Sequence, residues 1–139
     1  MKTFHFPLAL FLFAAVVAFA EDAPPPLKTQ TKCPIMGGAI NKALYADVQN
    51  QRIYVCCQGC VGAIKADPAK AFAGLQKNGE YAESLQKTCP VMGGPVNPKL
   101  SVDYEGRRLY ACCAGCLAPL RKDPAKYAKL IAPDETPAK

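Results

Sequence analysis

The stretches Cys33-Pro34-Ile35-Met36-Gly37-Gly38 and Cys56-Cys57-Gln58-Gly59-Cys60 decide the fold, because each of them occurs twice in the chain. The second copies are Cys89-Pro90-Val91-Met92-Gly93-Gly94 and Cys112-Cys113-Ala114-Gly115-Cys116, at a constant offset of 89 − 33 = 56 residues. A repeat that keeps its register without a gap is typical of tandem structural units. The sequence therefore predicts two copies of one unit, repeat 1 over residues 30–77 and repeat 2 over residues 86–132.

Each repeat is expected to contain a β-hairpin after its first cysteine. In repeat 1, Leu44 to Val48 and Arg52 to Val55 have strand character and are joined by Gln49-Asn50-Gln51. In repeat 2, Ser101 to Tyr104 and Arg107 to Ala111 flank Glu105-Gly106, a pair typical of tight hairpin turns. The knuckle-like turn at the first cysteine and this hairpin account for the first half of each repeat.

Two short helices are expected to follow the hairpin. The first begins at or near the cysteine pair, and in repeat 1 it buries Val61 and Ile64 at a spacing of three residues. The second has Asp67 or Asp123 as its N-cap with a proline at the first helical position. The predicted fold class is therefore α+β, with two small zinc-finger-like repeats, each a knuckle, a hairpin and short helices.

The segments outside the repeats carry other signals. Residues 1–20 have the pattern of a secretory signal peptide, with Lys2, an apolar run too short to span a membrane, and Ala18-Phe19-Ala20 as a cleavage site. We therefore expect a secreted or periplasmic protein of 139 − 20 = 119 residues, without stable membrane insertion after cleavage. We also expect a Pro-rich linker over 21–29, a linker over 78–85 and a disordered tail over 133–139.

The composition of the exported chain excludes several classes of site. Signal cleavage removes His5, the one histidine, so a Ser-His-Asp or Cys-His hydrolase and a histidine-containing zinc site are excluded. The formal net charge of +6 falls to +5, and the basic residues form no run that would favour a nucleic-acid partner. The chemistry of the mature protein therefore depends on sulfur.

All eight cysteines lie in the two repeated motifs. Proline and glycine favour a tight turn at Cys33, while Cys57 and Cys60 lie three residues apart at a helix start. A helix N-terminus lowers the pKa of a thiol, and the thiolate is the form that binds metal. The candidate metal ligands are Cys33, Cys56, Cys57, Cys60, Cys89, Cys112, Cys113 and Cys116, with Met36 and Met92 as further candidates.

The sequence resembles the YHS/TRASH domains, which are small treble-clef-like modules associated with heavy-metal trafficking, resistance and sensing. The resemblance rests on the Cys-Pro-x-Met-Gly-Gly motif, the stretch 102–110 before Cys112, the Cys-x3-Cys spacing, and the closing Asp123-Pro124-x-Lys126-Tyr127. It covers both repeats and implies ligation by Cys33, Cys56 and Cys60 and by Cys89, Cys112 and Cys116. The chain departs from the family at Met36 and Met92, where many members have cysteine, and at Cys57 and Cys113, where many have serine.

The ligand set leaves the metal open between Zn²⁺ and Cu⁺, at about one ion per repeat. Four cysteines per repeat suit a closed zinc site, whereas three cysteines with a Met thioether suit Cu⁺. Met36 and Met92 have a second interpretation as core residues that fill gaps. Asp47 and Asp103 are either fourth ligands or hairpin residues bonded to their own turns, and the second interpretation is favoured.

The predicted function is binding of a transition-metal ion for sequestration, trafficking or sensing outside the cytoplasm, with no enzyme activity. The expected partner besides the ion is a metal transporter or another exported metal protein. Two alternatives use the same sulfurs: a structural scaffold with two disulfides per repeat, and a thiol–disulfide oxidoreductase with Cys57-x-x-Cys60 as its redox pair.

Overall fold

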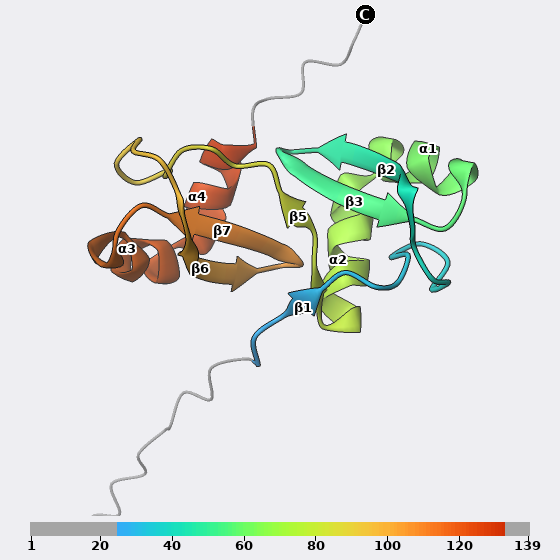
Figure 1. The fold of residues 1–139 in the computed structure, drawn as a ribbon, viewed down its shortest axis with the longest axis horizontal. Coiled ribbons are helices and arrows are strands. Elements are labelled where there is room, and N and C mark those ends of the chain that lie inside the picture. The colour runs from blue at the N-terminus through green and yellow to red at the C-terminus, as the bar shows by residue number, and fades with distance from the viewer. Residues whose placement is uncertain (1–24, 133–139) are drawn as a thin grey trace, which may run out of the picture.

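The two repeats form two neighbouring lobes of the same α+β construction (Figure 1). A computed structural model describes residues 25–132 of the chain. The predicted signal peptide and the tail over 133–139 lie outside the described residues. Repeat 1 comprises β2 (Asn41–Val48), β3 (Gln51–Val55), α1 (Gln58–Ala66) and α2 (Pro68–Asn78), and repeat 2 comprises β6 (Asn97–Tyr104), β7 (Arg107–Ala111), the 3₁₀ turn η1 (Ala114–Cys116), α3 (Leu117–Lys122) and α4 (Pro124–Ile131). The predicted α+β class is confirmed.

Both hairpins close through two-residue turns in the left-handed region. Gln49 and Asn50 have φ of 50° and 58°, and Glu105 and Gly106 have φ of 45° and 69°. Turns of this kind match the twist of the flanking strands. The three-residue loop expected in repeat 1 is wrong by one residue, because Gln51 belongs to β3 and pairs with Val48.

The helix starts follow the predicted pattern. The Asp67 side chain accepts a hydrogen bond from the backbone N–H of Lys70, and Asp123 does the same for Lys126, both at 3.0 Å. The first helix of repeat 2 differs from α1, since it opens with η1. Pro119 stands where repeat 1 has Ala63, and it has no N–H to donate to the carbonyl four residues earlier, so this turn lacks one α-helical hydrogen bond.

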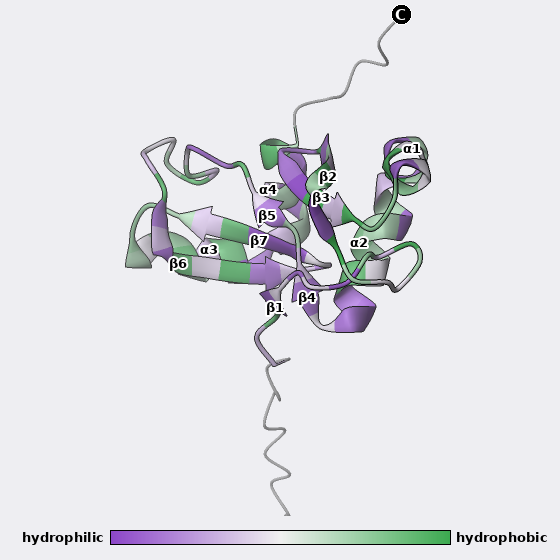
Figure 2. Ribbon diagram, turned by 45° about the vertical axis from the view of Figure 1, so that its right-hand side comes forward, coloured by the Kyte–Doolittle hydropathy of each residue, from purple (hydrophilic) through white to green (hydrophobic). Residues whose placement is uncertain are grey.

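Each repeat has its own hydrophobic core. In repeat 1, Ile53 and Val55 of β3 pack with Ile64 of α1 and with Phe72 and Leu75 of α2, and all five are buried. In repeat 2, the corresponding cluster includes Leu109, Leu120 and Ile131. Hydrophobic and hydrophilic residues alternate along β6, as Figure 2 shows, which is the pattern of a strand with one face on a core. Among the described residues, no helix is both long enough and apolar enough to cross a membrane.

The segments before the two repeats contain short strands, and each segment lies on the hairpin of the other repeat. The stretch 78–85, expected to be a linker, contains β4 (Glu80–Tyr81) and β5 (Glu83–Ser84), and β5 pairs antiparallel with β3. Leu27, which lies 56 residues before Glu83, donates its N–H to Asp103 at 2.9 Å and accepts from Arg108 at 3.0 Å. β1 (Lys28–Thr29), which lies in the expected Pro-rich linker, pairs parallel with β4. We call this reciprocal arrangement the crossed leaders.

The tip of the second hairpin docks on the second helix of repeat 1. Gly106 accepts a hydrogen bond from the N–H of Ala82 and donates its own N–H to the Gln76 side chain, both at 2.9 Å. The guanidinium of Arg107 lies 3.9 Å from the centre of the Phe72 ring. The two repeats therefore share an interface of backbone, polar and cation–π contacts.

A glycine of α2 sets the distance between this helix and the first knuckle. A Cβ added at Gly74 would lie 2.5 Å from the backbone carbonyl oxygen of Pro34. We expect Gly74→Ala to lower the free energy of unfolding by about 1–3 kcal/mol, because backbone has to move to relieve the clash. Gly62→Ala in α1 is the control, since nothing lies within 4 Å of its Cβ position and the helix gains propensity. Equal denaturation midpoints for the two variants would contradict this contact.

Candidate metal centres

Three cysteines of each repeat gather at one point. Cys33, Cys56 and Cys60 place their sulfurs within 4.8 Å of one another, and Cys89, Cys112 and Cys116 do the same in repeat 2. Cys33 and Cys60 are buried, with exposed fractions of 0% and 3%, whereas Cys56 is half-buried. We call these groups cluster 1 and cluster 2. The resemblance to the YHS/TRASH domains implied both of these groups, and each could hold a metal ion.

The knuckle turn presents the first cysteine of each cluster. In repeat 1, Cys33 donates its N–H to the carbonyl of Gly38, and Gly37 donates to the carbonyl of Cys33, both at 2.8 Å. Gly37 has a φ of 74°, which glycine adopts without strain. The Cβ position of Gly38 lies 3.8 Å from the Cys56 sulfur, so the turn packs directly over the cluster. The equivalent contacts of repeat 2 have the same form.

A buried glutamine ties each knuckle to the strand that leads into its cysteine pair. The Gln30 side chain donates to the carbonyls of Lys32 and Tyr54, at 3.0 and 2.7 Å, and accepts from the N–H of Tyr54 at 2.9 Å. Lys32 precedes Cys33, and Tyr54 lies two residues before Cys56. Gln30 therefore fixes the separation between two cysteines of cluster 1.

Gln86 repeats this arrangement in the second unit. It donates to the carbonyls of Thr88 and Tyr110, at 2.8 and 2.7 Å, and accepts from the N–H of Tyr110 at 2.9 Å. Sequence reasoning missed both glutamines as site residues. The signal was their position as the first residue of each repeat, at the same offset of 56.

An acidic residue braces the knuckle of cluster 1. The buried carboxylate of Glu80 accepts hydrogen bonds from the backbone N–H groups of Thr31 and Lys32, at 3.0 and 3.2 Å, and from the Thr31 hydroxyl. The offset of 56 places Thr136, which lies outside the described residues, opposite Glu80. Glu80 therefore holds the backbone that leads into Cys33.

Backbone N–H groups favour the thiolate at the first cysteine of each cluster. Burial acts to raise the pKa of Cys33, but hydrogen bonds from the backbone N–H groups of Met36 and Cys56 outweigh it, and the pKa is lowered. Burial and backbone N–H donors oppose each other in the same way at Cys89 and lower its pKa to about 7. The first cysteine of each cluster is therefore well suited to bind metal as a thiolate.

The last cysteine of each cluster has the opposite tendency. Burial, followed by the hydrogen bond with Cys57, raises the pKa of Cys60. The hydrogen bond with Cys113, together with burial, raises the pKa of Cys116 to about 12. A metal ion that bound these sulfurs would displace a proton, so its affinity would increase with pH.

Cys57 and Cys113 lie beside the clusters and are exposed. The Cys57 sulfur is 3.3 Å from that of Cys60, and the Cys113 sulfur is 3.3 Å from that of Cys116. The hydrogen bond from Cys60 and further backbone donors lower the pKa of Cys57. All eight cysteines are free, and these separations exceed the bond length of a disulfide, about 2.05 Å.

The other candidate ligands from the sequence, two methionines and two aspartates, are not members of the clusters. Met36 and Met92 are 70% and 72% exposed, so the interpretation as core residues that fill gaps is wrong. Asp47 and Asp103 pair with the arginines opposite them on their hairpins, Arg52 at 2.8 Å and Arg108 at 2.7 Å. The favoured expectation that these aspartates bond to their own turns is wrong, because each accepts hydrogen bonds from a cross-strand arginine, and Asp103 also accepts one from the N–H of Leu27.

Three thiolate sulfurs fit a transition-metal ion in size and in kind. Sulfurs bound to one ion at about 2.3 Å stand about 4 Å apart. Cys112 and Cys116, at 3.6 Å, are already close to that separation. Soft sulfur ligands without imidazole select ions such as Zn²⁺ and Cu⁺.

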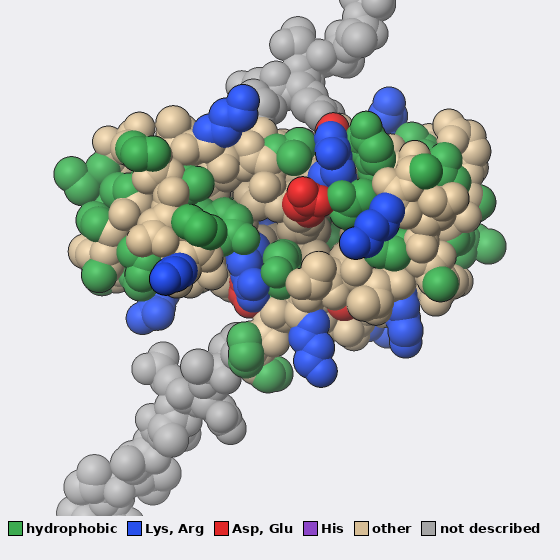
Figure 3. All heavy atoms as spheres, in the orientation of Figure 1, with side chains coloured by type: hydrophobic (Ala, Val, Ile, Leu, Met, Phe, Trp, Pro, Cys, Tyr) green, Lys and Arg blue, Asp and Glu red, His purple; other side chains and the backbone are tan. Residues whose placement is uncertain are grey.

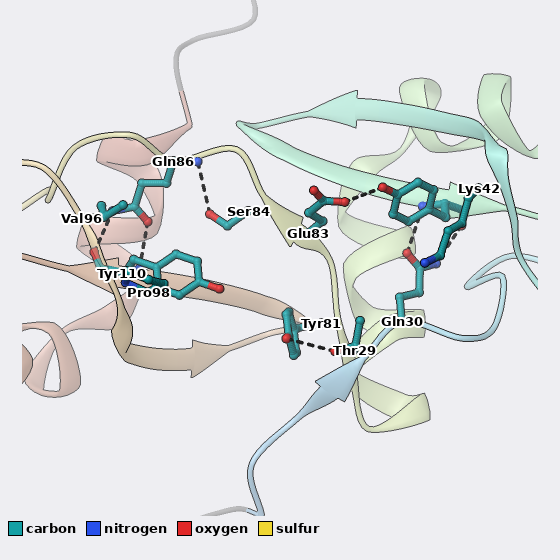
Figure 4. Close-up of a pocket in the computed structure, with 11 residues that line it drawn as sticks. Thr29, Gln30, Lys42, Tyr81, Glu83, Ser84, Gln86, Val96, Pro98 and Tyr110 are labelled. Carbon is teal, nitrogen blue, oxygen red and sulfur yellow. Dashed lines mark hydrogen bonds between the residues drawn. The ribbon is translucent and has the colours of Figure 1, made fainter.

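The interface between the repeats also forms a cleft, separate from the clusters (Figure 4). It has a volume of about 500 Å³, and none of its lining residues is a cysteine. Tyr81, Tyr110 and Glu83 line it, together with Gln30 and Gln86. The polar contacts drawn there are those that hold the crossed leaders and the knuckles in place, including the bond from the Tyr54 hydroxyl to Glu83.

The fold and the clusters define an α+β protein with two similar halves, each with a cysteine cluster that could bind a metal ion. Comparisons of the chain with known protein families, with curated proteins and with solved structures found no match. The two clusters are therefore the features of the molecule that point to a function.

Proposed function

We propose that the protein binds one transition-metal ion per repeat through the thiolates of cluster 1 and cluster 2. The observation that carries this proposal is the presence of the same three-sulfur group, with two buried members, at the same place in both repeats. The buried cysteines also pack in the two hydrophobic cores, but core packing does not require three sulfurs to meet at one point, whereas a shared ion does. Zn²⁺ and Cu⁺ are the candidate ions.

The proposal extends to the protein family, the cellular location and the role of the protein. We assign both repeats to the YHS/TRASH type, with a treble-clef-like knuckle, on the motifs of the sequence. The pattern of residues 1–20 supports action in the periplasm or outside the cell. The role is sequestration, trafficking or sensing of the metal, without enzyme activity, in contact with a metal transporter or another exported metal protein.

Metal titration of the reduced protein under anaerobic conditions tests the proposal. We expect two ions per chain by elemental analysis with either Zn²⁺ or Cu⁺, and a thermal midpoint that increases with free metal concentration. Cys33→Ser should reduce the stoichiometry to one, because it removes a buried sulfur from cluster 1 only. Competition between the two metals identifies the preferred ion.

Two results would contradict metal binding. One is a wild-type chain that takes up neither ion at micromolar concentration. The other is a protein that, when isolated from its native compartment, contains disulfides throughout and no free thiol, since the structural scaffold would then be correct.

A second candidate function is thiol–disulfide exchange. It is favoured by one observation: Cys57 is exposed, has a lowered pKa and lies 3.3 Å from the buried Cys60. Reduction of an insulin disulfide with turnover, abolished by Cys57→Ser with Cys113→Ser, would establish it. The absence of turnover would rule out this second candidate, and the metal titration would then decide between metal binding and the scaffold.

A further inference from the structure

We propose that Cys57 and Cys113 are transit ligands, which take a soft metal ion from a thiol-bearing carrier and pass it to the buried sulfurs of the adjacent cluster. This inference rests on the proposed function, because it assumes that the clusters hold the ion. It adds a route of loading and the chemical class of the partner that supplies the metal.

Accessibility is the first argument. The first and last cysteines of each cluster are almost fully enclosed, with exposed fractions between 0% and 3% for Cys33, Cys60, Cys89 and Cys116. A carrier that holds the metal through its own sulfur has to approach within a bond length of a new ligand. Cys57 and Cys113 are exposed, whereas Cys56 and Cys112 are half-buried, so Cys57 and Cys113 are the sulfurs that such a carrier reaches first.

Distance is the second argument. Cys57 lies outside the group of three sulfurs that are mutually close, yet its sulfur is 3.3 Å from that of Cys60. One ion with metal–sulfur bonds of about 2.3 Å can therefore contact both sulfurs at once. The ion can move inward by gaining the bond to Cys60 before it loses the bond to Cys57.

Repetition is the third argument. Cys113 and Cys116 show the same separation of 3.3 Å, and Cys113 is exposed as well. Both exposed cysteines hold an extended backbone just before a helical turn, so the main chain presents them in the same way. If the position is functional, each repeat should keep an exposed thiol at the same distance from its own cluster, as is found here.

The transfer step is a ligand exchange without oxidation or reduction. A bond forms between the ion and the Cys57 sulfur as the bond between the ion and the carrier thiolate breaks, and the Cys57 proton passes to the released carrier sulfur. The ion then bonds to Cys60, whose proton returns to Cys57. Thiol and thiolate are conserved in number, and the metal keeps its charge.

The experiment compares transfer rate with equilibrium binding in the full exported chain. Cu⁺ bound to glutathione is the thiol-bearing probe, and stopped-flow absorbance follows its transfer to the reduced protein. In the variant Cys57→Ser with Cys113→Ser, we expect two ions per chain and an affinity within about threefold of wild type, but a transfer rate lower by at least about tenfold. Gln58→Ser with Ala114→Ser, at exposed positions next to the two cysteines, should transfer at the wild-type rate.

A second measurement does not depend on a variant. In the metal-loaded wild-type protein, N-ethylmaleimide should modify Cys57 and Cys113 and no member of the clusters, as read by mass spectrometry. Protection of these two cysteines, or loss of bound metal in the serine variant, would make them permanent ligands and overturn the transit role. A wild-type transfer rate in that variant would also overturn it while leaving metal binding intact, whereas a wild-type chain that binds no ion would refute the proposed function itself.

Discussion

Gly106→Ala is expected to lower the free energy of unfolding by about 3 kcal/mol or more. The residue has a φ of 69°, where a side chain adds strain of about 1 kcal/mol. In addition, its Cβ would collide with the backbone carbonyl of Phe72 and lie 2.9 Å from the Cβ of Leu75. Overpacking against the backbone costs a further ~2 kcal/mol. Urea denaturation followed by far-UV circular dichroism measures the change.

Gly79→Ala is the matched control for this substitution. Gly79 has a φ of 70°, almost the same as Gly106, but nothing lies within 4 Å of its Cβ position. The control thus carries the backbone strain without the collision, and should cost about 1 kcal/mol. If the two variants lost equal stability, the docking of the hairpin tip on α2 would not be a major source of stability.

Gln30→Leu is expected to lower the metal affinity of cluster 1 by about 10- to 100-fold, the range for groups that orient metal ligands. The substitution removes three hydrogen bonds and leaves the N–H and carbonyl of Tyr54 without their partner. Each unsatisfied buried group costs about 1–3 kcal/mol, so stability should also fall by several kcal/mol, about 3 in total. Titration with Zn²⁺ should resolve one weakened and one normal site.

Gln86→Leu provides the internal control, because it makes the same change at cluster 2. We expect the weakened site to be in repeat 2. Cys33→Ser in the same chain can verify this, because it removes cluster 1 and leaves the weakened site to be measured by itself. A uniform loss of affinity at both sites in either variant would show that the glutamines act on global stability and not on the local placement of the cysteines.

Much of each repeat could be predicted from the sequence because its signals are local. The aspartate N-caps at Asp67 and Asp123, the turn pair Glu105-Gly106 and the spacing of the cysteines all act within a few residues. The constant offset of 56 doubled the evidence for each of them. The grouping of Cys33 with Cys56 and Cys60 came from the resemblance to the YHS/TRASH domains, because the spacing alone allowed either Cys56 or Cys57 to lie next to Cys60.

The parts that could not be predicted depend on contacts between distant segments. The stretches at β1 and at β4 and β5 are short and polar, and their strand character comes from the partners that they meet across the molecule. In the sequence Gln30 resembles any polar loop residue, because its hydrogen bonds depend on β3, which lies next to it only in the folded protein. The exposure of Met36 likewise depends on where the knuckle lies relative to the core, which no periodicity encodes.

The basic residues are dispersed, as the sequence predicts, but some of them have contacts that the sequence does not predict. On the face drawn in Figure 3, Lys and Arg side chains are dispersed among neutral and apolar ones. Three arginines are instead engaged with aromatic rings: Arg52 over Tyr45, Arg107 over Phe72 and Arg108 over Tyr81. These cations contribute to packing as well as to net charge.

The crossed leaders give the chain an exchange of arms like that of a domain-swapped dimer. Leu27 bonds to the side chains of Asp103 and Arg108, and Glu83 pairs with Arg52, the equivalent of Arg108, although only β5 adds a strand to a hairpin. A dimer of separate subunits dissociates on dilution, but a covalently joined pair keeps a high effective concentration of each half for the other. The two halves therefore stay paired at protein concentrations at which separate subunits would dissociate.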